Sequence, residues 1–281
     1  MKKKEDSRMI RLMRKNTILT WFIAIILYIV IMIGSYYFDD SDLVEIIAYL
    51  LQCLMLGGCL YVIAGSKPFE TCRRGTGYVF RKDWPILILP MLFTGIGIIS
   101  PVKEGTPLHS DWVVRTALGF AVMMLAGLSE ELCFRAAACE ALLPKLKNTK
   151  HPFLFTAVIS GLVFGLMHVA LEGIDSWMSA LLGIMKILTT GLFGASMMIL
   201  YWKTRNMLAI GLLHGLYDFI SSCIEYMFVI EETAEEAAYT GGGIETLIVY
   251  LIQMAVNLLV LRAVYRNTGK SADYHHILEE W

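Results

Sequence analysis

Three short motifs place acidic and histidine side chains inside otherwise apolar stretches of the chain. They are "LSEELCFRAA" at residues 128–137, "FGLMH" at 164–168 and "HGLYD" at 214–218. Glutamate and histidine are residue types that bind divalent metals or take a proton from water near neutral pH. An ionisable side chain at the centre of a membrane helix costs at least ~2.5–3.5 kcal/mol on insertion scales, so each one needs a partner or a function.

Helical geometry separates the two adjacent acids of the first motif. Glu131 and Arg135 are four residues apart, in the favourable acid-first order, so they can pair on one helix face. Glu130 points about 100° away from Glu131 and stays available for another helix. The alternative is that all three charges only form a buried polar network that fixes helix packing.

The other two motifs each place a histidine one helical turn from a second notable residue. His168 follows Phe164 by four residues, and His214 precedes Asp218 by four, so each pair shares a helix face. A single histidine on an apolar helix is usually a packing residue. Two histidines and an uncommitted glutamate on three separate spans favour a functional site, in which we expect Glu130, His168 and His214 to converge within about 4–6 Å.

The elements that carry these motifs are predicted to be membrane helices. Of the 281 residues, 57% are hydrophobic and 17% are charged, which is typical of an integral membrane protein. Apolar runs of about 20 residues can cross ~30 Å of hydrocarbon as helices. Eight such runs occur, at Thr17–Phe38, Leu43–Gly65, Trp84–Ser100, Trp112–Leu143, Pro152–Leu171, Trp177–Trp202, Met207–Ile230 and Ile244–Val264.

The fold class is therefore all-α, a polytopic membrane protein with about eight transmembrane helices. We expect one integral membrane domain over residues 1–281, with a catalytic core at about 110–230. Loops rich in Lys and Arg alternate with acidic or neutral loops, which puts both termini in the cytoplasm, at the plasma membrane if the source is prokaryotic. The net charge of −1 gives no indication of nucleic-acid binding.

Other polar and small residues in the spans are predicted to have structural roles. Glu140, near the cytoplasmic end of its helix, is expected to reach the interface and to tolerate replacement by Gln. Lys186 lies at a depth where it could meet Asp218, and Glu225 is expected to pair or to line a cavity. Glycines at helical spacing would allow close helix contact; they are Gly161 with Gly165 and Gly211 with Gly215.

The three motifs together resemble those of a known protease family. E-E-x-x-x-R at 130–135, F-x-x-x-H at 164–168 and H-x-x-x-D at 214–218 occur in the order found in the CPBP intramembrane proteases, also called the CAAX protease and bacteriocin-processing or Abi family. The resemblance covers roughly residues 110–230. It implies an all-α membrane fold whose core helices enclose a polar catalytic cavity, in which a water molecule cleaves peptide bonds.

The resemblance also implies roles for individual residues. Glu130 would be the general base and His168 would hold the same water, while His214 and the last residue of the third motif would stabilise the oxyanion. The family has Asn or Asp at that last position. An ionised Asp218 cannot donate a hydrogen bond to an oxyanion, so Asp218 is expected to orient His214, to join it around a cation, or to remain protonated. The structural supports are Glu131, Arg135 and Phe164.

The use of a metal is ambiguous in the family and in this sequence, and we expect a metalloendopeptidase. Zinc or another divalent cation would suit Glu130, His168 and His214 as ligands, with an open position for water. A metal-free mechanism would rely on Glu130 alone to activate the water.

The expected substrate is a hydrophobic peptide or a lipid-anchored protein that reaches the site through membrane lipid. The sequence leaves two other functions as alternatives. A catalytically idle member could act as an immunity or scaffold partner, although the intact glutamate and histidines argue against this. A secondary transporter could also line a cavity with such residues, but the sequence lacks the related halves from which many transporters are built.

Overall fold

A computed structural model describes residues 8–38, 41–70, 75–170, 172–230 and 240–280 of the chain. The described residues are mainly helical and contain no strand, as the all-α prediction requires. Eight helices or runs of consecutive helices in this part of the chain are long and apolar enough to cross a membrane. They are α2 (Thr17–Phe38), α3 (Asp42–Ala64), α5 to α7, α8 to α9, α10 (Pro152–Val169), α11 (Trp177–Thr204), α12 (Met207–Met227) and α14 (Ile244–Asn267).

Short helices flank these spans. An amphipathic helix precedes the first span, a single turn follows the second, and two short helices follow the last. They are α1 (Arg8–Lys15), α4 (Lys67–Glu70), η3 (Gly269–Ser271) and α15 (Tyr274–Glu280). Leu171, the expected end of the fifth span, lies outside the described residues, and α10 ends at Val169.

The third span is longer than the sequence predicted. It runs from Thr76 to Glu104 instead of Trp84–Ser100, because the polar segment before Trp84 is also helical. Asp83 ends that segment, and its buried carboxylate accepts a 2.6 Å hydrogen bond from the Thr268 hydroxyl. The acidic side chain at the end of this segment is therefore hydrogen-bonded inside the protein. The span consists of α5 (Thr76–Asp83), η1 (Trp84–Leu87), α6 (Ile88–Gly97) and α7 (Ile99–Glu104).

The fourth span contains a change of helix type immediately after the adjacent glutamates. It consists of α8 (Trp112–Glu131), a π-helix η2 (Leu132–Ala137) and α9 (Ala138–Leu146). Insertions of π-helix are rare and frequently occur at functional sites. Here the insertion follows Glu130 and Glu131 and contains Arg135, so it sets the directions in which the first motif presents its charges.

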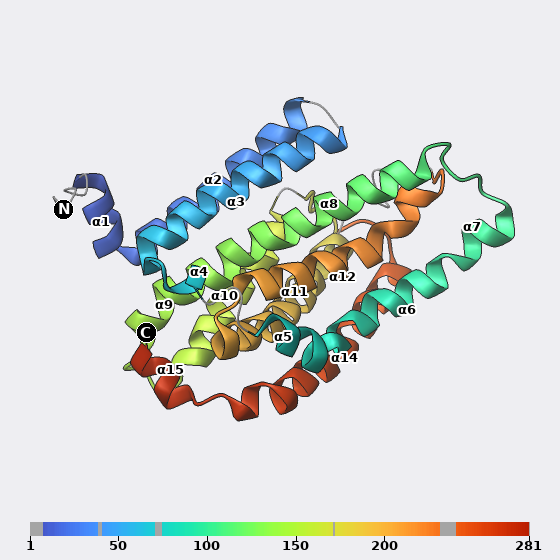
Figure 1. The fold of residues 1–281 in the computed structure, drawn as a ribbon. Helices are drawn as coiled ribbons and strands as arrows, with labels where there is room; N and C mark the ends of the chain where they lie inside the picture. The colour runs from blue at the N-terminus through green and yellow to red at the C-terminus, as the bar shows by residue number, and fades with distance from the viewer. Residues whose placement is uncertain (1–7, 39–40, 71–74, 171, 231–239, 281) are drawn as a thin grey trace.

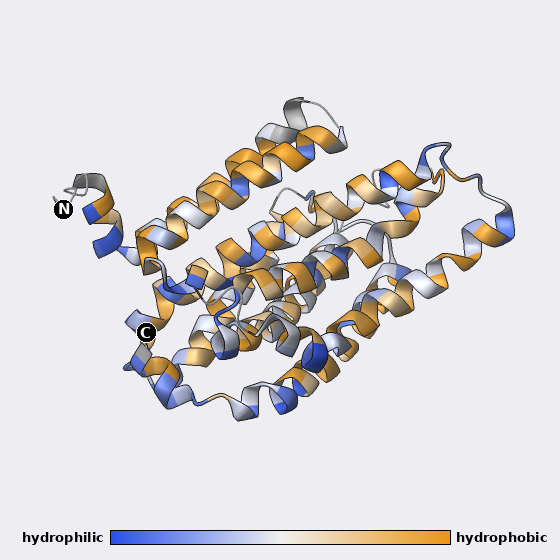
Figure 2. Cartoon of the chain, viewed as in Figure 1, coloured by the Kyte–Doolittle hydropathy of each residue, from blue (hydrophilic) through white to orange (hydrophobic). Residues whose placement is uncertain are grey.

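The long helices form a bundle in which α8, α10, α11 and α12 are central (Figure 1). The closest pairs are α8 with α12 and α10 with α11, while α2 and α3 pack together on one side and α14 packs on α11. Apolar residues run along the length of the long helices (Figure 2). The N- and C-terminal ends of the chain lie at the same end of the bundle.

Glycines allow the central helices to approach closely, as the sequence predicted. A Cβ on Gly211 would lie 2.8 Å from the Leu128 Cα, and one on Gly215 would lie 2.7 Å from the Met124 Cα. Gly127 on α8 faces the backbone of Gly215 in the same contact. The pair Gly161 and Gly165 faces the backbone of α11 in a comparable way. The contacts at Gly127, Gly211 and Gly215 hold the first and third motifs against each other.

Candidate active site

Glu130 lies in the last turn of α8 and contacts two other helices. Its Oε1 accepts a 3.0 Å hydrogen bond from the Tyr28 hydroxyl on α2. Its Oε2 lies 3.5 Å from Nε2 of His214 on α12, and 15% of the Glu130 side chain is exposed. The carboxylate is thus held at both oxygens while it remains partly accessible.

His214 is buried and has three carboxylates around its ring. Nδ1 lies 2.8 Å from Glu131 Oε1 and must donate, since an ionised carboxylate only accepts. Nε2 lies 3.5 Å from Glu130 Oε2 and 3.4 Å from Asp218 Oδ2. Asp218 is therefore placed to orient His214, which is one of the three roles that we expected for it. The three acids surround a position where a positive charge on the ring would be stabilised.

Glu131 and Arg135 form the expected ion pair, at 3.4 Å between Oε2 and Nε, and both side chains are completely buried. The guanidinium carbon also lies 3.9 Å from the centre of the Phe164 ring, within the range of a cation–π contact. Gly194 provides the space, because a Cβ there would be 2.8 Å from Arg135 Nη2. The sequence missed the other function of Glu131, which accepts a hydrogen bond from His214 through its second oxygen.

His168 is oriented by its own helix. Its Nδ1 lies 2.9 Å from the Phe164 carbonyl oxygen one turn earlier and donates to it, so in the neutral form of the ring Nε2 is the acceptor. The Phe164 ring packs edge-on against the His168 ring, at 4.6 Å between centroids, and against the His214 ring, at 6.0 Å. Phe164 therefore contacts the ionic pair and both histidines of the site.

A pocket of about 370 Å³ opens beside Glu130 and His168. Its wall contains both polar and apolar side chains, contributed by α2, α3, α8, η2 and α10 and by the segment after α10. The residues are Tyr28, Met32, Tyr49, Glu130, Phe134, Phe164, Met167, His168 and Glu172. Glu130 and His214 lie within the expected separation, and His168 shares a pocket with Glu130. The polar catalytic cavity stays a prediction.

Tyr28 is the site residue that sequence reasoning missed. Tyr28 lies on the first span, outside the three motifs, and contributes a hydroxyl to Glu130. Its backbone carbonyl also accepts a 3.0 Å hydrogen bond from the Gln52 amide on α3. The available signal was a tyrosine and a glutamine in the middle of apolar runs, where each polar group requires a partner.

Glu140 differs from our expectation. It does not reach the interface, because it is 4% exposed. Its carboxylate accepts hydrogen bonds of 2.6 and 2.5 Å from the Arg205 guanidinium and one of 3.0 Å from the Tyr201 hydroxyl. This network ties α9 to the end of α11. Replacement of Glu140 by Gln would remove the charge from a buried ion pair, so the tolerance that we expected loses its basis.

Lys186 on α11 interacts electrostatically with Asp218, Glu130 and Glu172. The sequence placed Lys186 near Asp218, and this interaction agrees with that placement. A cation beside several carboxylates reduces their mutual repulsion. The role of Glu225 stays a prediction.

The residues expected to bind a metal are Glu130, His168 and His214. Across the described ranges, no group of three or more His, Cys, Asp or Glu side chains is arranged to hold a metal ion. His214 Nδ1 is bonded to Glu131, and His168 Nδ1 to a backbone carbonyl. Participation of zinc or another divalent cation stays a prediction, and the chemistry derived below uses only the side chains of this chain.

A comparison with family models covers all three motifs. Residues 112–220 match the model described as type II CAAX prenyl endopeptidase, Rce1-like. This match confirms the resemblance to the CPBP family of CAAX proteases. It extends from the start of α8 into α12 and therefore includes Glu130, His168, His214 and Asp218. No match was found among curated proteins or among solved structures.

The family match and the eight apolar helices support a multi-pass membrane protein. The same match supports an intramembrane endopeptidase in general.

Proposed function

We propose that this protein is an intramembrane endopeptidase in which Glu130 activates the water that cleaves the peptide bond. The observation that carries the proposal is the position of Glu130. It lines a pocket together with His168, and its two carboxylate oxygens face Tyr28 and His214. A general base needs this combination of access to water and a fixed orientation.

In the first step, Glu130 removes a proton from a water molecule in the pocket. His168 accepts a hydrogen bond from the other proton of that water through Nε2. The water oxygen forms a bond to the carbonyl carbon of the substrate, and the π electrons of the carbonyl move to its oxygen. The product is a tetrahedral intermediate with one negative charge on oxygen.

His214 is the group that stabilises this oxyanion. In its doubly protonated form the ring donates to Glu131 from Nδ1 and can donate from Nε2 to the oxyanion. The surrounding acids favour that charged form, and Asp218 and Glu131 hold the ring in place. The intermediate then collapses, the C–N bond breaks, and Glu130 transfers the proton to the departing amine.

The substrate is a membrane-associated peptide or a lipid-anchored, for example prenylated, protein. The family match supports this class, since the matched family is described as a prenyl endopeptidase. The pocket beside Glu130 also has Met32, Met167 and Phe134 in its wall, which can contact an apolar side chain of the substrate.

The test is cleavage of a quenched-fluorescence library of hydrophobic peptides by the purified full-length protein in lipid vesicles. We expect turnover by the wild type and its loss in Glu130→Gln, by about 10²–10⁴-fold, because an amide cannot take the proton. Glu245→Gln is the matched control, since Glu245 is exposed in the first turn of α14. Both variants should match the wild type in monodisperse yield.

Addition of a chelator to the same assay tests whether a metal takes part in the reaction. Turnover that survives chelation supports the glutamate mechanism described above, and turnover that is lost and then restored by zinc supports the metal route. If the wild type cleaves no member of the library while it is folded, the endopeptidase assignment is wrong and the idle partner becomes the better reading. Wild-type turnover by Glu130→Gln would show that the base is another residue.

A further inference from the structure

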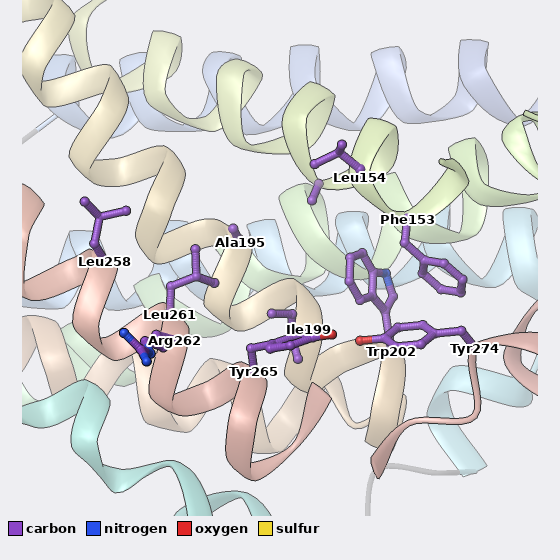
Figure 3. A pocket seen from close by; sticks show the side chains of 11 residues that line it. Phe153, Leu154, Ala195, Ile199, Trp202, Leu258, Leu261, Arg262, Tyr265 and Tyr274 are labelled. Carbon is purple, nitrogen blue, oxygen red and sulfur yellow. The ribbon is translucent and has the colours of Figure 1, made fainter. Parts of the chain in front are cut away.

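A second pocket, of about 500 Å³, lies between α10, α11, α14 and α15 (Figure 3). Its walls are aliphatic and aromatic and include Leu154, Ala195, Ile199, Trp202 and Leu258. None of its lining residues lines the pocket of the candidate active site. Three of these helices, α10, α11 and α14, are candidate membrane spans, so lipid is the solvent around the part of the pocket that they form.

Polar groups occur along one edge of this pocket. Arg262 on α14 is exposed, and it forms no ion pair with any described residue. Tyr265 follows on the same face of α14, and 46% of it is exposed. Figure 3 shows the side chains of Tyr265 and Tyr274 pointing toward one another across the pocket. A guanidinium and two hydroxyls thus adjoin an apolar volume.

The depth of Arg262 suggests what it binds. It lies five residues before the end of α14 at Asn267, which is about 7.5 Å at helical rise. At that depth a long side chain can extend its charge toward the lipid headgroups. Arg266 and Lys270 follow it toward the end of the bundle that carries both termini and add two basic side chains near this end of α14.

We propose that this pocket binds one anionic glycerophospholipid, with an acyl chain in the apolar volume and the phosphate at Arg262. Basic sites between transmembrane helices bind phospholipid headgroups in this way. A lipid tail gains little from the hydrophobic effect when it leaves a bilayer for an apolar pocket. The preference for an anionic lipid over other lipids therefore has to come from Arg262 and the two tyrosine hydroxyls. The fit of the acyl chain to the pocket adds van der Waals contacts.

The test is native mass spectrometry of the full-length protein, titrated with phosphatidylglycerol and with phosphatidylcholine of identical acyl chains. The wild type should bind one phosphatidylglycerol about fivefold or more tightly than phosphatidylcholine. Arg262→Gln should remove that preference. Ala195→Leu, which reduces the apolar volume, should weaken binding of both lipids.

Arg266→Gln is the matched control, because Arg266 is an exposed arginine one turn further along α14 that does not line the pocket. It should retain most of the preference for phosphatidylglycerol. Equal binding of the two lipids by the wild type would overturn the proposal. So would wild-type selectivity in Arg262→Gln, or a pocket occupied by a second copy of the chain in a lipid-free dimer. This experiment does not depend on proteolysis.

Discussion

At the scale of single residues, two neighbouring glutamates have different environments because consecutive helical side chains point about 100° apart. Glu130 faces a pocket and is partly exposed, whereas Glu131 is completely buried between Arg135 and His214. A buried acid such as Glu131, which contacts an arginine through one oxygen and an imidazole through the other, can hold that imidazole in a fixed orientation. A partly exposed acid can exchange protons with water. The same residue type therefore serves two purposes.

Replacement of Tyr28 by Phe should lower kcat of the proposed proteolysis about tenfold or more, with KM unchanged. The variant keeps the ring and its edge-on contact with Phe134 but loses the hydroxyl that donates to Glu130. A hydrogen bond to a charged group contributes ~1.5–3 kcal/mol, and about 1.4 kcal/mol corresponds to a tenfold rate change. Steady-state kinetics with the reporter peptide measure this.

Tyr201→Phe is the control for Tyr28→Phe. It removes a tyrosine hydroxyl that donates to another glutamate, Glu140, at 3.0 Å. We expect Tyr201→Phe to lower the Tm and to leave kcat unchanged, since Glu140 lies outside the site. Equal kcat losses in the two variants would mean that Tyr28 acts through folding alone.

Replacement of Arg135 by Ala should reduce stability severely. Removing one member of a buried ion pair typically costs ~3–5 kcal/mol because the other charge stays buried. Arg115→Ala is the matched comparison. Arg115 pairs with Asp111 at the same i,i+4 spacing, but these side chains are 47% and 56% exposed, and such pairs contribute at most ~1 kcal/mol.

Unfolding in detergent, followed by tryptophan fluorescence, measures both arginine variants. We expect Arg135→Ala to give a low folded yield and Arg115→Ala to resemble the wild type. A stable Arg135→Ala protein with selective loss of turnover would instead assign Arg135 a direct part in the chemistry.

At the scale of elements, the site is assembled where the π-helix η2 meets the glycine-lined contact between α8 and α12. The insertion of η2 after Glu131 changes the helical register within the first motif. The glycines let α12 approach α8 closely enough for His214 to reach both glutamates. Bulkier residues at these positions would separate the motifs.

Gly215→Ala should therefore lower both stability and turnover. The new methyl group would lie 2.5 Å from the Met123 carbonyl oxygen and 2.7 Å from the Met124 Cα, so the helices must separate. Gly58→Ala on α3 is the control, because a Cβ there meets nothing within 4 Å. Alanine also has the higher helix propensity, by ~1 kcal/mol.

Thermal unfolding and peptide turnover of the two glycine variants decide this prediction. Gly58→Ala should be as stable as the wild type or slightly more stable. A Gly215→Ala protein with unchanged Tm and turnover would show that the contact between α8 and α12 is looser than the structure indicates.

At the scale of the whole molecule, an even number of spans places both chain ends on one side of the membrane. Figure 1 shows the two ends of the chain at the same end of the bundle. The basic residues that the positive-inside rule uses are concentrated in the segments that we assigned to that side. The pocket proposed to bind a phospholipid lies toward the same end.

We expect both termini to be cytoplasmic. A green fluorescent protein fused after Trp281 should fluoresce, whereas an alkaline phosphatase fused after Gly105, in an expected external loop, should be active. The reverse pattern would invert the topology and would place Arg262 near the outer leaflet.

The sequence by itself determined the class of the protein and most of its site. Long apolar runs have to be membrane helices because no other open structure satisfies the backbone in lipid. The i,i+4 spacing had to bring Glu131 to Arg135 and His214 to Asp218, because helical geometry is local. Only the tertiary structure decided which helices meet. It brought Tyr28 from the first span to Glu130, bonded Glu131 to His214, and buried Glu140 against Arg205. These contacts join residues 65 to 102 positions apart, and no local periodicity encodes them.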